Sequence, residues 1–494
     1  MITMGRDVLA PLPNLGWFAL LLLAGWCAGI RDGVAPLTLL GAAWIAAVPT
    51  LLYTNGGSAL SDTAMLAGLM AAVALWRNSE GDLGWLAVSG LALGLSIAAK
   101  LTVAPTAAAF AVAVVVLAPA ARRRLTLGVL AAGIAAACSF WFVRNLLRTG
   151  SPLPNLDVPL FPSSPLPLVD RFGYTVSDFL TDGDAWRTVF WPGIRVFFGW
   201  SGLLAAVAGA AALPGIVRRK DRTLLVLTGC ALFGLLTYLV VPAGAWGDGE
   251  PNLLLFTVNL RYALPPLALS LVVAAVAMAS APPWLRAGYG GLLAAATALQ
   301  AFRPGDYELP AARYTLAALA VVASIAVAVA AARFVPTPTR VKWAAAAAVL
   351  VVAVVVAGPP VARRQLDRSA AATAANPVFA WAASVEDARI GYYSVLGHYP
   401  MYGPRWQNDL VYVGVKGPHG AFRAVDNCQE YVEVLERHQF DYVVLGPPEA
   451  VYQDVDLPAW TATQTGSDQV LDAPPYSVYR VTPPYDPASC PAAS

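Results

Sequence analysis

Long apolar segments separated by short polar loops fill the first three quarters of the chain. About twelve of them are long and apolar enough to cross a bilayer core of ~30 Å, which takes ~20 helical residues. The pattern therefore predicts a polytopic α-helical membrane part over residues 1–358. The predicted spans are 15–30, 34–53, 62–76, 84–99, 101–119, 125–143, 199–217, 223–241, 262–280, 284–301, 312–333 and 342–358.

Basic residues of the short loops occur in every second loop. Short loops rich in lysine and arginine stay in the cytoplasm, so this set is predicted to be cytoplasmic. The loop 54–61 has no basic residue and is predicted to lie outside, and alternation places the long loop 150–198 and everything after 358 outside as well. The basic set comprises Arg31, Arg77, Arg122 to Arg124, Arg218 to Arg222, Arg286, and Arg333 to Lys342.

The pattern changes at about residue 359. Residues 359–494 contain nine basic and fifteen acidic side chains, with alternating apolar runs between turn residues. Strands are predicted at 388–393, 410–414, 442–446 and 476–481, and the spacing from Cys428 to His438 predicts a helix. This is the pattern of a small extracytoplasmic α/β domain over 359–494, with a loose tail after Pro483.

Composition narrows the function classes. The chain is 58% apolar and 13% charged, about half the charge of a soluble domain, which agrees with a multi-pass protein of the cell membrane. A net charge of +2 without a basic tract gives no support for nucleic acid as a partner. Cys428 and Cys490 pair if their region is extracytoplasmic, and the sequence leaves this open. All three histidines lie in that region, which excludes a histidine-based metal centre in the membrane part.

Four charged residues stand at predicted outer ends of spans: Asp62, Lys100, Arg144 and Arg261. One carboxylate and three cations at one interface suit an anionic head group. The acid serves either as a general base or as a ligand for a divalent cation, so a metal cofactor stays open. Each residue alone is also explained as an interfacial anchor, and Asp62 as a helix cap. Their shared side favours the functional interpretation.

The outer loop 150–198 is proline-rich at first and then aromatic and acidic. Long loops of this kind cover sites in membrane enzymes, although 185–198 equally fits an amphipathic helix on the membrane surface. Asp182 and Asp184 form a weak Asp-x-Asp metal signal.

Four motifs resemble the C-type membrane glycosyltransferases, which include the protein O-mannosyltransferase-like and aminoarabinose-transferase-like families of bacteria. The resemblance covers nearly the whole chain, although each motif alone is degenerate. The motifs are Ser61-Asp62 opening a span, Gly90-Leu-Ala-Leu-Gly-Leu-Ser-Ile-Ala-Ala-Lys100, Phe142-Val-Arg144-Asn145-Leu-Leu-Arg-Thr-Gly150 and Arg261-Tyr262-Ala-Leu-Pro265.

The resemblance implies transfer of a sugar from a polyprenyl-phosphate carrier to an acceptor on the outer face. It implies that Asp62 is the second acidic residue of the site, and that the lipid phosphate is held by a basic and aromatic set. That set is Lys100, Arg144, Asn145, Arg261 and Tyr262.

One departure concerns the principal catalytic acid, which the family carries in its first outer loop after an initial span. Loop charges here place the residues before span 15–30 outside, so an upstream span and acidic loop are expected to precede Met1. An N-terminally truncated product, a non-catalytic member that binds lipid-linked sugar, and an enzyme using another acid all remain open. A lipid or solute transporter is the alternative outside the family. The sequence does not identify the sugar, the acceptor (protein, lipid or polysaccharide) or the oligomeric state.

Overall fold

The chain divides into two compact units. The computed structural model describes residues 12–48, 51, 61–153, 160–161, 174–219, 221–241, 253–301, 375–395, 398–416, 422–446 and 455–490. The helical unit comprises Ala10–Val143 and Leu168–Val361, and the C-terminal unit comprises Ala362–Ser494 with Met1–Leu9 and Arg144–Pro167. The predicted spans 312–333 and 342–358, and the domain boundary at 358, lie outside the described residues.

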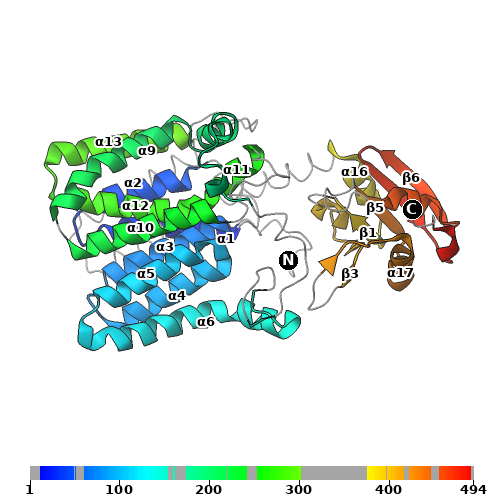
Figure 1. Ribbon diagram of the computed structural model, residues 1–494, viewed down its shortest axis with the longest axis horizontal. Coiled ribbons are helices and arrows are strands. Elements are labelled where there is room, and N and C mark those ends of the chain that lie inside the picture. Colours follow the sequence, from blue (N-terminus) through cyan, green and yellow to red (C-terminus); the bar gives the residue numbers. More distant parts are fainter. Residues whose placement is uncertain are drawn as a thin grey trace. The chain divides into compact units, whose positions relative to one another are not determined.

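Apolar helices form the helical unit (Figure 1), and all of those named below overlap a predicted span, whereas the short α11 (Leu253–Asn259) was not predicted. Among the described helices, four stretches are long and apolar enough to cross a membrane, namely Ala120–Thr149, Gly183–Val217, Arg222–Val240 and Phe256–Ser280, beside shorter apolar helices. The prediction of a polytopic helical membrane protein is confirmed. The helices are α1 (Leu12–Ala28), α2 (Ala35–Ala46), α3 (Asp62–Arg77), α4 (Leu83–Ala99), α5 (Ala104–Leu117), α6 (Arg123–Thr149), α9 (Trp191–Arg219), α10 (Arg222–Val240), α12 (Leu264–Ala277) and α13 (Pro283–Ala301).

Helices α3 and α4 pack antiparallel at very short range. Ser89 Oγ donates to the carbonyl oxygen of Ala72 at 2.8 Å, and Ser96 Oγ donates to that of Met65 at 2.6 Å. A Cβ atom on Gly68 would lie 2.8 Å from a carbonyl oxygen of α4, so only glycine fits there. Small residues allow this close approach in membrane helices. The antiparallel pairing brings the start of α3 and the end of α4 to one end of the unit.

Helices α5 and α10 form a second antiparallel pair. Arg222 Nη2, at the start of α10, donates to the carbonyl oxygen of Val116 at 3.4 Å, near the end of α5. Further along, Cys230 Sγ donates to the carbonyl oxygen of Ala109 at 3.3 Å. The end of α10 therefore lies beside the start of α5.

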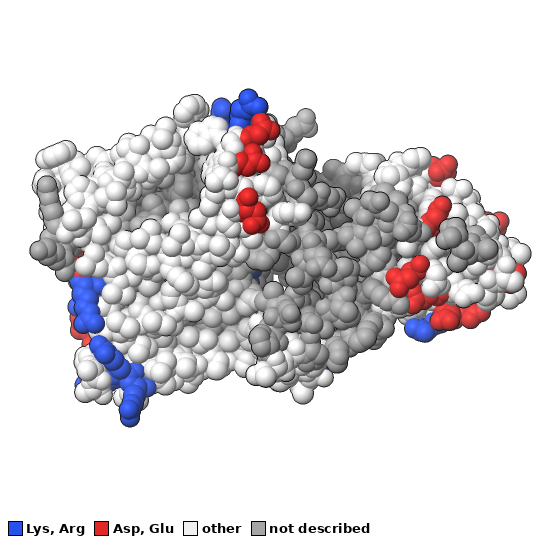
Figure 2. All heavy atoms as spheres, in the orientation of Figure 1, with Lys and Arg blue, Asp and Glu red and all other residues white. Residues whose placement is uncertain are grey.

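The opposite end of the unit carries the basic loops. Arg77, the last residue of α3, forms an ion pair with Asp32, and its Nε donates to the carbonyl oxygen of Ala28 at 2.9 Å. Arg31 Nη1 in turn donates to the carbonyl oxygen of Arg77 at 3.3 Å. On the face shown in Figure 2, charged side chains gather at the ends of the helices and the broad middle is uncharged. The grouping of these loops agrees with the predicted alternation.

Helix α9 is broken at Gly199, whose φ of 57° and ψ of −153° lie outside the helical region. A buried network satisfies backbone groups at the break. Gln300 Nε2 donates to the carbonyl oxygen of Phe197 at 3.1 Å, Ser201 Oγ donates to that of Phe198 at 2.6 Å, and Trp44 Nε1 donates to Ser201 Oγ at 3.2 Å. The predicted span 199–217 begins at this break. The segment predicted as a surface helix forms α8 (Gly183–Ala185), η6 (Trp186–Phe190) and the start of α9.

The C-terminal unit is a three-layer α/β structure around a five-stranded sheet of order β2-β1-β5-β7-β6. Strands β1 (Arg389–Tyr393), β2 (Asp409–Tyr412) and β5 (Tyr442–Leu445) are parallel. Strands β7 (Tyr476–Val481) and β6 (Ser467–Ala473) continue the sheet antiparallel. The four predicted strands and the predicted helix α17 (Cys428–His438) are confirmed, and β6 was not predicted.

Alternation along the strands fills both faces of this sheet. Val443 and Leu445 pack with α17 and α18 (Leu457–Ala462), whereas Val444 packs on the other face with α16 (Pro377–Ser384). A short antiparallel pair, β3 (Val415–Lys416) and β4 (Phe422–Arg423), lies between β2 and α17 in the chain.

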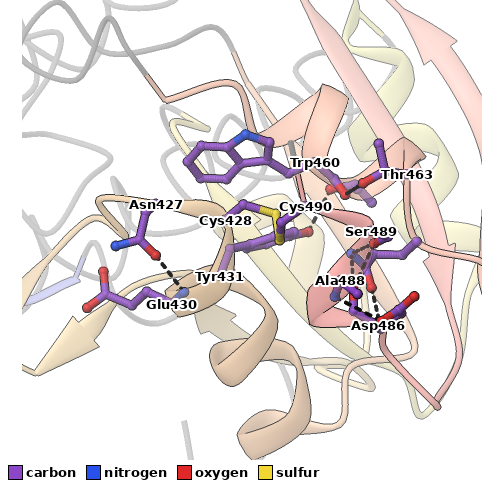
Figure 3. The surroundings of a disulfide bond; sticks show 12 residues. Asn427, Cys428, Glu430, Tyr431, Trp460, Thr463, Asp486, Ala488, Ser489 and Cys490 are labelled. Carbon is purple, nitrogen blue, oxygen red and sulfur yellow. Dashed lines mark hydrogen bonds between the residues drawn. A yellow bond between two sulfur atoms is a disulfide. The ribbon is translucent and has the colours of Figure 1, made fainter. Parts of the chain in front are cut away.

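A disulfide joins Cys428, the first residue of α17, to Cys490 (Figure 3). Tyr485 is buried, and Gln464 Oε1 accepts from the backbone nitrogen of Asp486 at 2.8 Å. The prediction of a loose tail after Pro483 is therefore wrong as far as residue 490, because this cross-link and these contacts hold the segment against α17.

Candidate functional site

Asp62 and Lys100 form a buried ion pair at one end of the helical unit. Asp62 is the first residue of α3 and its side chain is fully buried. Its Oδ1 accepts a hydrogen bond from Lys100 Nζ. Lys100 follows the last residue of α4 with an extended backbone and leads into η3 (Leu101–Val103). The close α3–α4 packing thus brings together two residues that are 38 positions apart.

Arg261 and Tyr262 complete the cluster from η7 (Leu260–Ala263), the turn that precedes α12. Arg261 Nη1 lies 3.7 Å from Asp62 Oδ2. The ring of Tyr262 lies beside both cations, with its centroid 5.0 Å from Lys100 Nζ and 5.4 Å from Arg261 Cζ. Cations at such distances are attracted to the face of an aromatic ring. We call Asp62, Lys100, Arg261 and Tyr262 the acid–base cluster.

The acid–base cluster carries an excess of positive charge, because two cations surround one carboxylate. The side chains of Lys100 and Arg261 are each 18% exposed, so both retain a route to a ligand. Two buried atoms, Asp62 Oδ2 and Arg261 Nε, have no hydrogen-bond partner among the described residues. Buried polar groups are normally paired. A cationic group with an unmatched donor is suited to bind an anion.

The helix-cap interpretation of Asp62 does not hold. The N-cap position of α3 belongs to Ser61, whose side chain makes no capping bond, and Asp62 stands one residue further. Its side chain bonds instead to Lys100. A carboxylate in the first turn still interacts favourably with the helix dipole. Asp62 therefore faces the acid–base cluster while it also stabilises the start of α3.

Arg144 and Asn145 lie within α6, which continues to Thr149 and does not end at residue 143 as predicted. Asn145 Nδ2 donates to the carbonyl oxygen of Pro152 at 3.3 Å, which closes the turn after the helix. Both residues belong to the C-terminal unit. The structure brings Asp62, Lys100, Arg261 and Tyr262 together, and a role for Arg144 and Asn145 at the donor phosphate stays a prediction.

The Asp-x-Asp signal of the outer loop has a structural explanation. Asp182 caps α8, with its Oδ1 accepting from the backbone nitrogens of Asp184 and Ala185 at 2.9 and 3.0 Å. The carboxylate of Asp184 pairs with exposed Arg187 at 2.7 Å. Within the described ranges, no three His, Cys, Asp or Glu side chains gather as a metal site would require. A divalent cation stays an open prediction.

Two further buried side chains, Tyr238 and Thr63, were not predicted as site residues. Tyr238 lies in the last turn of α10, and Thr63 follows Asp62 in α3. Both hydroxyl groups are buried and have no hydrogen-bond partner in the part of the chain that the structure describes. A tyrosine near the end of an apolar span resembles an ordinary interfacial anchor, so the sequence offers no signal that distinguishes it.

Comparison with solved structures finds a similar fold. No family model matches the sequence, and no curated protein matches it. The fold is similar to the crystal structure of ArnT from Cupriavidus metallidurans in the apo state, with a TM-score of 0.50 and 16% identity over 98% of this chain and 84% of that chain. The ArnT structure bound to undecaprenyl phosphate gives a TM-score of 0.49 and 16% identity over 95% and 83% of the two chains. The likeness to the apo structure shows that the chain shares the fold of that ArnT structure.

Proposed function

We propose that the protein is a membrane glycosyltransferase, which moves a sugar from a polyprenyl-phosphate donor to an envelope acceptor on the extracytoplasmic face. The observation that carries the proposal is the acid–base cluster, where a fully buried carboxylate stands between two partly exposed cations. The fold shared with ArnT and the motifs that resemble C-type membrane glycosyltransferases support it. ArnT of that fold has been solved with undecaprenyl phosphate bound, a ligand of the proposed kind.

Lys100 and Arg261 bind the phosphate of the donor. When the sugar leaves, the bond between the anomeric carbon and the phosphate oxygen breaks and its electron pair stays with the phosphate. Negative charge on the phosphate therefore grows in the transition state, and fixed cations lower its energy. Arg261 has an unmatched Nε–H group for a phosphate oxygen, and Tyr262 holds both cations beside its ring.

Asp62 acts on the acceptor. Its Oδ1 is engaged by Lys100, whereas Oδ2 has no hydrogen-bond partner among the described side chains. An acceptor hydroxyl attacks the anomeric carbon and gives its proton to Oδ2, so that the carboxylate serves as general base. Lys100 connects the acceptor side of the site with the donor side, because it forms a hydrogen bond with Asp62 and also binds the donor phosphate. Arg144 and Asn145 are assigned to the donor from the resemblance of their motif.

The outer face is proposed from charge and from the disulfide. The basic loops lie at the end of the helical unit opposite to Asp62, and the positive-inside rule places that end in the cytoplasm. The Cys428–Cys490 disulfide fits an oxidising, extracytoplasmic compartment for the C-terminal unit.

Transfer of a labelled sugar tests the proposal. Membrane vesicles that contain the protein are supplied with a panel of labelled polyprenyl-phosphate sugars and with native envelope material as acceptor. Asp62→Asn is expected to lower transfer at least about 100-fold, the lower range for loss of a general base. Arg261→Ala is expected to lower transfer by a similar factor because the phosphate loses a cation.

Matched controls lie at the other end of the unit. Asp82→Asn keeps the N-cap of α4, and Arg222→Ala removes an exposed cation, so both are expected to transfer like the parent. Full activity of Asp62→Asn or of Arg261→Ala would refute the assignment. A parent that binds donor but transfers no sugar to any acceptor would identify a non-catalytic binding protein.

A further inference from the structure

Tyr238 lies at the same end of the helical unit as the acid–base cluster. The register of α10 against α5 determines the position of Tyr238 along the helical unit. Cys230 contacts Ala109, and one turn later Gly234 is so close to Thr106 that a Cβ there would lie 2.5 Å from Thr106 Oγ1. One more turn of α10 brings Tyr238 level with η3, the segment directly after Lys100.

The contact between α10 and α12 independently gives the same position for Tyr238 along the helical unit. A Cβ on Gly234 would also lie 2.8 Å from Pro266 Cβ. Tyr238 follows Gly234 by four residues, and Tyr262 precedes Pro266 by four residues on a segment that runs the other way. The two tyrosines are therefore neighbours.

The hydroxyl of Tyr238 is buried. The side chain is 8% exposed, and its oxygen makes no hydrogen bond to any described residue. A buried hydroxyl in an apolar bundle is unfavourable unless an acceptor reaches it. Lys100 and Arg261 lie beside the ring of Tyr262, the neighbour of Tyr238. An anion bound by those cations is therefore an acceptor within the same part of the molecule.

We infer that Tyr238 is a further donor-binding residue, whose hydroxyl donates a hydrogen bond to the phosphate of a polyprenyl phosphate held by Lys100 and Arg261. The inference rests on the proposed function, because it takes the lipid phosphate as the ligand. Phosphate oxygens suit this role because they are anionic acceptors, and charge-assisted hydrogen bonds are the stronger kind. The isoprenoid chain offers no acceptor.

Binding of undecaprenyl phosphate to the purified full chain in detergent tests the inference, with undecaprenol as a probe that lacks the phosphate. Tyr238→Phe keeps the ring and removes the hydroxyl. It is expected to weaken binding of undecaprenyl phosphate about tenfold, the loss of one hydrogen bond to a charged group. Binding of undecaprenol is expected to stay unchanged, which a general structural defect would not allow.

Tyr289→Phe is the matched control. Tyr289 lies two turns after the start of α13, and this start is at the end of the helical unit opposite to η7. The hydroxyl of Tyr289 is also buried, with no hydrogen-bond partner among the described residues. This variant is expected to bind both probes like the parent. Arg261→Ala separates the two proposals, since it reports on the phosphate site without involving Tyr238.

Each possible outcome either supports or overturns the role of Tyr238. If Arg261→Ala loses undecaprenyl phosphate and Tyr238→Phe binds it like the parent, the role of Tyr238 is overturned and the proposed function stands. If Tyr238→Phe weakens both probes equally, Tyr238 shapes the lipid channel and the inference is overturned. A parent that binds neither probe overturns the inference together with the proposed function. A tenfold loss confined to the phosphate probe in Tyr238→Phe supports it.

Discussion

The charge balance around Asp62 leads to a stability prediction with a definite order. Lys100 and Arg261 are the two cations that offset this fully buried carboxylate. Removing the partner of a buried charge costs about 3–5 kcal/mol, because the remaining charge is left uncompensated. Replacing a single cation by methionine is expected to cost less than this here, since the other cation remains.

The distance between Arg261 and Asp62 gives the size of the attraction that remains when Lys100 is replaced. Arg261 Nη1 lies 3.7 Å from Asp62 Oδ2. At an effective dielectric constant of about 20, two charges so separated attract by about 4 kcal/mol before desolvation. Lys100→Met alone is therefore expected to cost about 2 kcal/mol, and Lys100→Met with Arg261→Met about 3–5 kcal/mol. Adding Asp62→Asn to the double variant removes the stranded charge and is expected to restore about 2 kcal/mol.

The assay uses the thiols of the helical unit. Cys138 and Cys230 are buried and free, Cys27 is free and half-buried, and Cys428 and Cys490 are in the disulfide. A thiol-reactive dye added during a thermal ramp in detergent therefore reports unfolding of the helical unit. The parent is expected to have the highest Tm and the double variant the lowest, with Lys100→Met and the triple variant close together between them. A triple variant that melts no higher than the double variant would refute the reasoning, because Asp62 would then not be the charge that the cations balance.

Two further predictions concern packing. Replacing Cys428 and Cys490 by serine is expected to cost the C-terminal unit about 4 kcal/mol, since the cross-link spans 62 residues; faster proteolysis of that unit checks it, and unchanged resistance would contradict it. Gly90→Ala places a Cβ 2.6 Å from the carbonyl oxygen of Leu130 and is expected to lower stability by about 1–3 kcal/mol, measured by the dye assay. Gly128→Ala, which meets nothing within 4 Å, is the control and is expected to melt like the parent or higher.

Much of the helical unit could be predicted because apolar length alone identifies a span. Helix ends were less predictable. Helix α6 runs past Arg144 because the following Leu146 and Leu147 continue a helical segment despite exposures of 42% and 80%. The charge at residue 144 lowers the hydropathy, so the span was predicted to end at residue 143. The backbone hydrogen bonds that decide where the helix ends are not affected by this charge.

In the C-terminal unit, the predicted strands are those whose alternation fills a core. Strand β6 was missed because its side chains are mostly exposed and polar, and it is held by pairing with β7 across a register shift between Gln469 and Leu471. The tail was predicted wrongly because a disulfide partner 62 residues away overrides the local proline-rich composition.

For the candidate site, the sequence predicted that the charged residues lie at the same end of the helical unit, but it gave no distances between them. Helix length and loop charge were enough to place Asp62, Lys100 and Arg261 at one end of the unit. The ion pair between Asp62 and Lys100 depends on how closely α3 and α4 pack, which only the backbone contact at Gly68 reveals. Tyr238 was missed because its meaning depends on a neighbour in another helix.

The central claim is that the acid–base cluster holds the phosphate of a polyprenyl-linked donor. A structure of the full chain with bound undecaprenyl phosphate, determined by electron cryomicroscopy in a lipid nanodisc, tests it most directly. The phosphate is expected within hydrogen-bond distance of Lys100 Nζ and of the Arg261 guanidinium, beside the ring of Tyr262. A lipid phosphate bound at the end of the unit near Arg77 and Arg222, with no phosphate at Lys100, would contradict it.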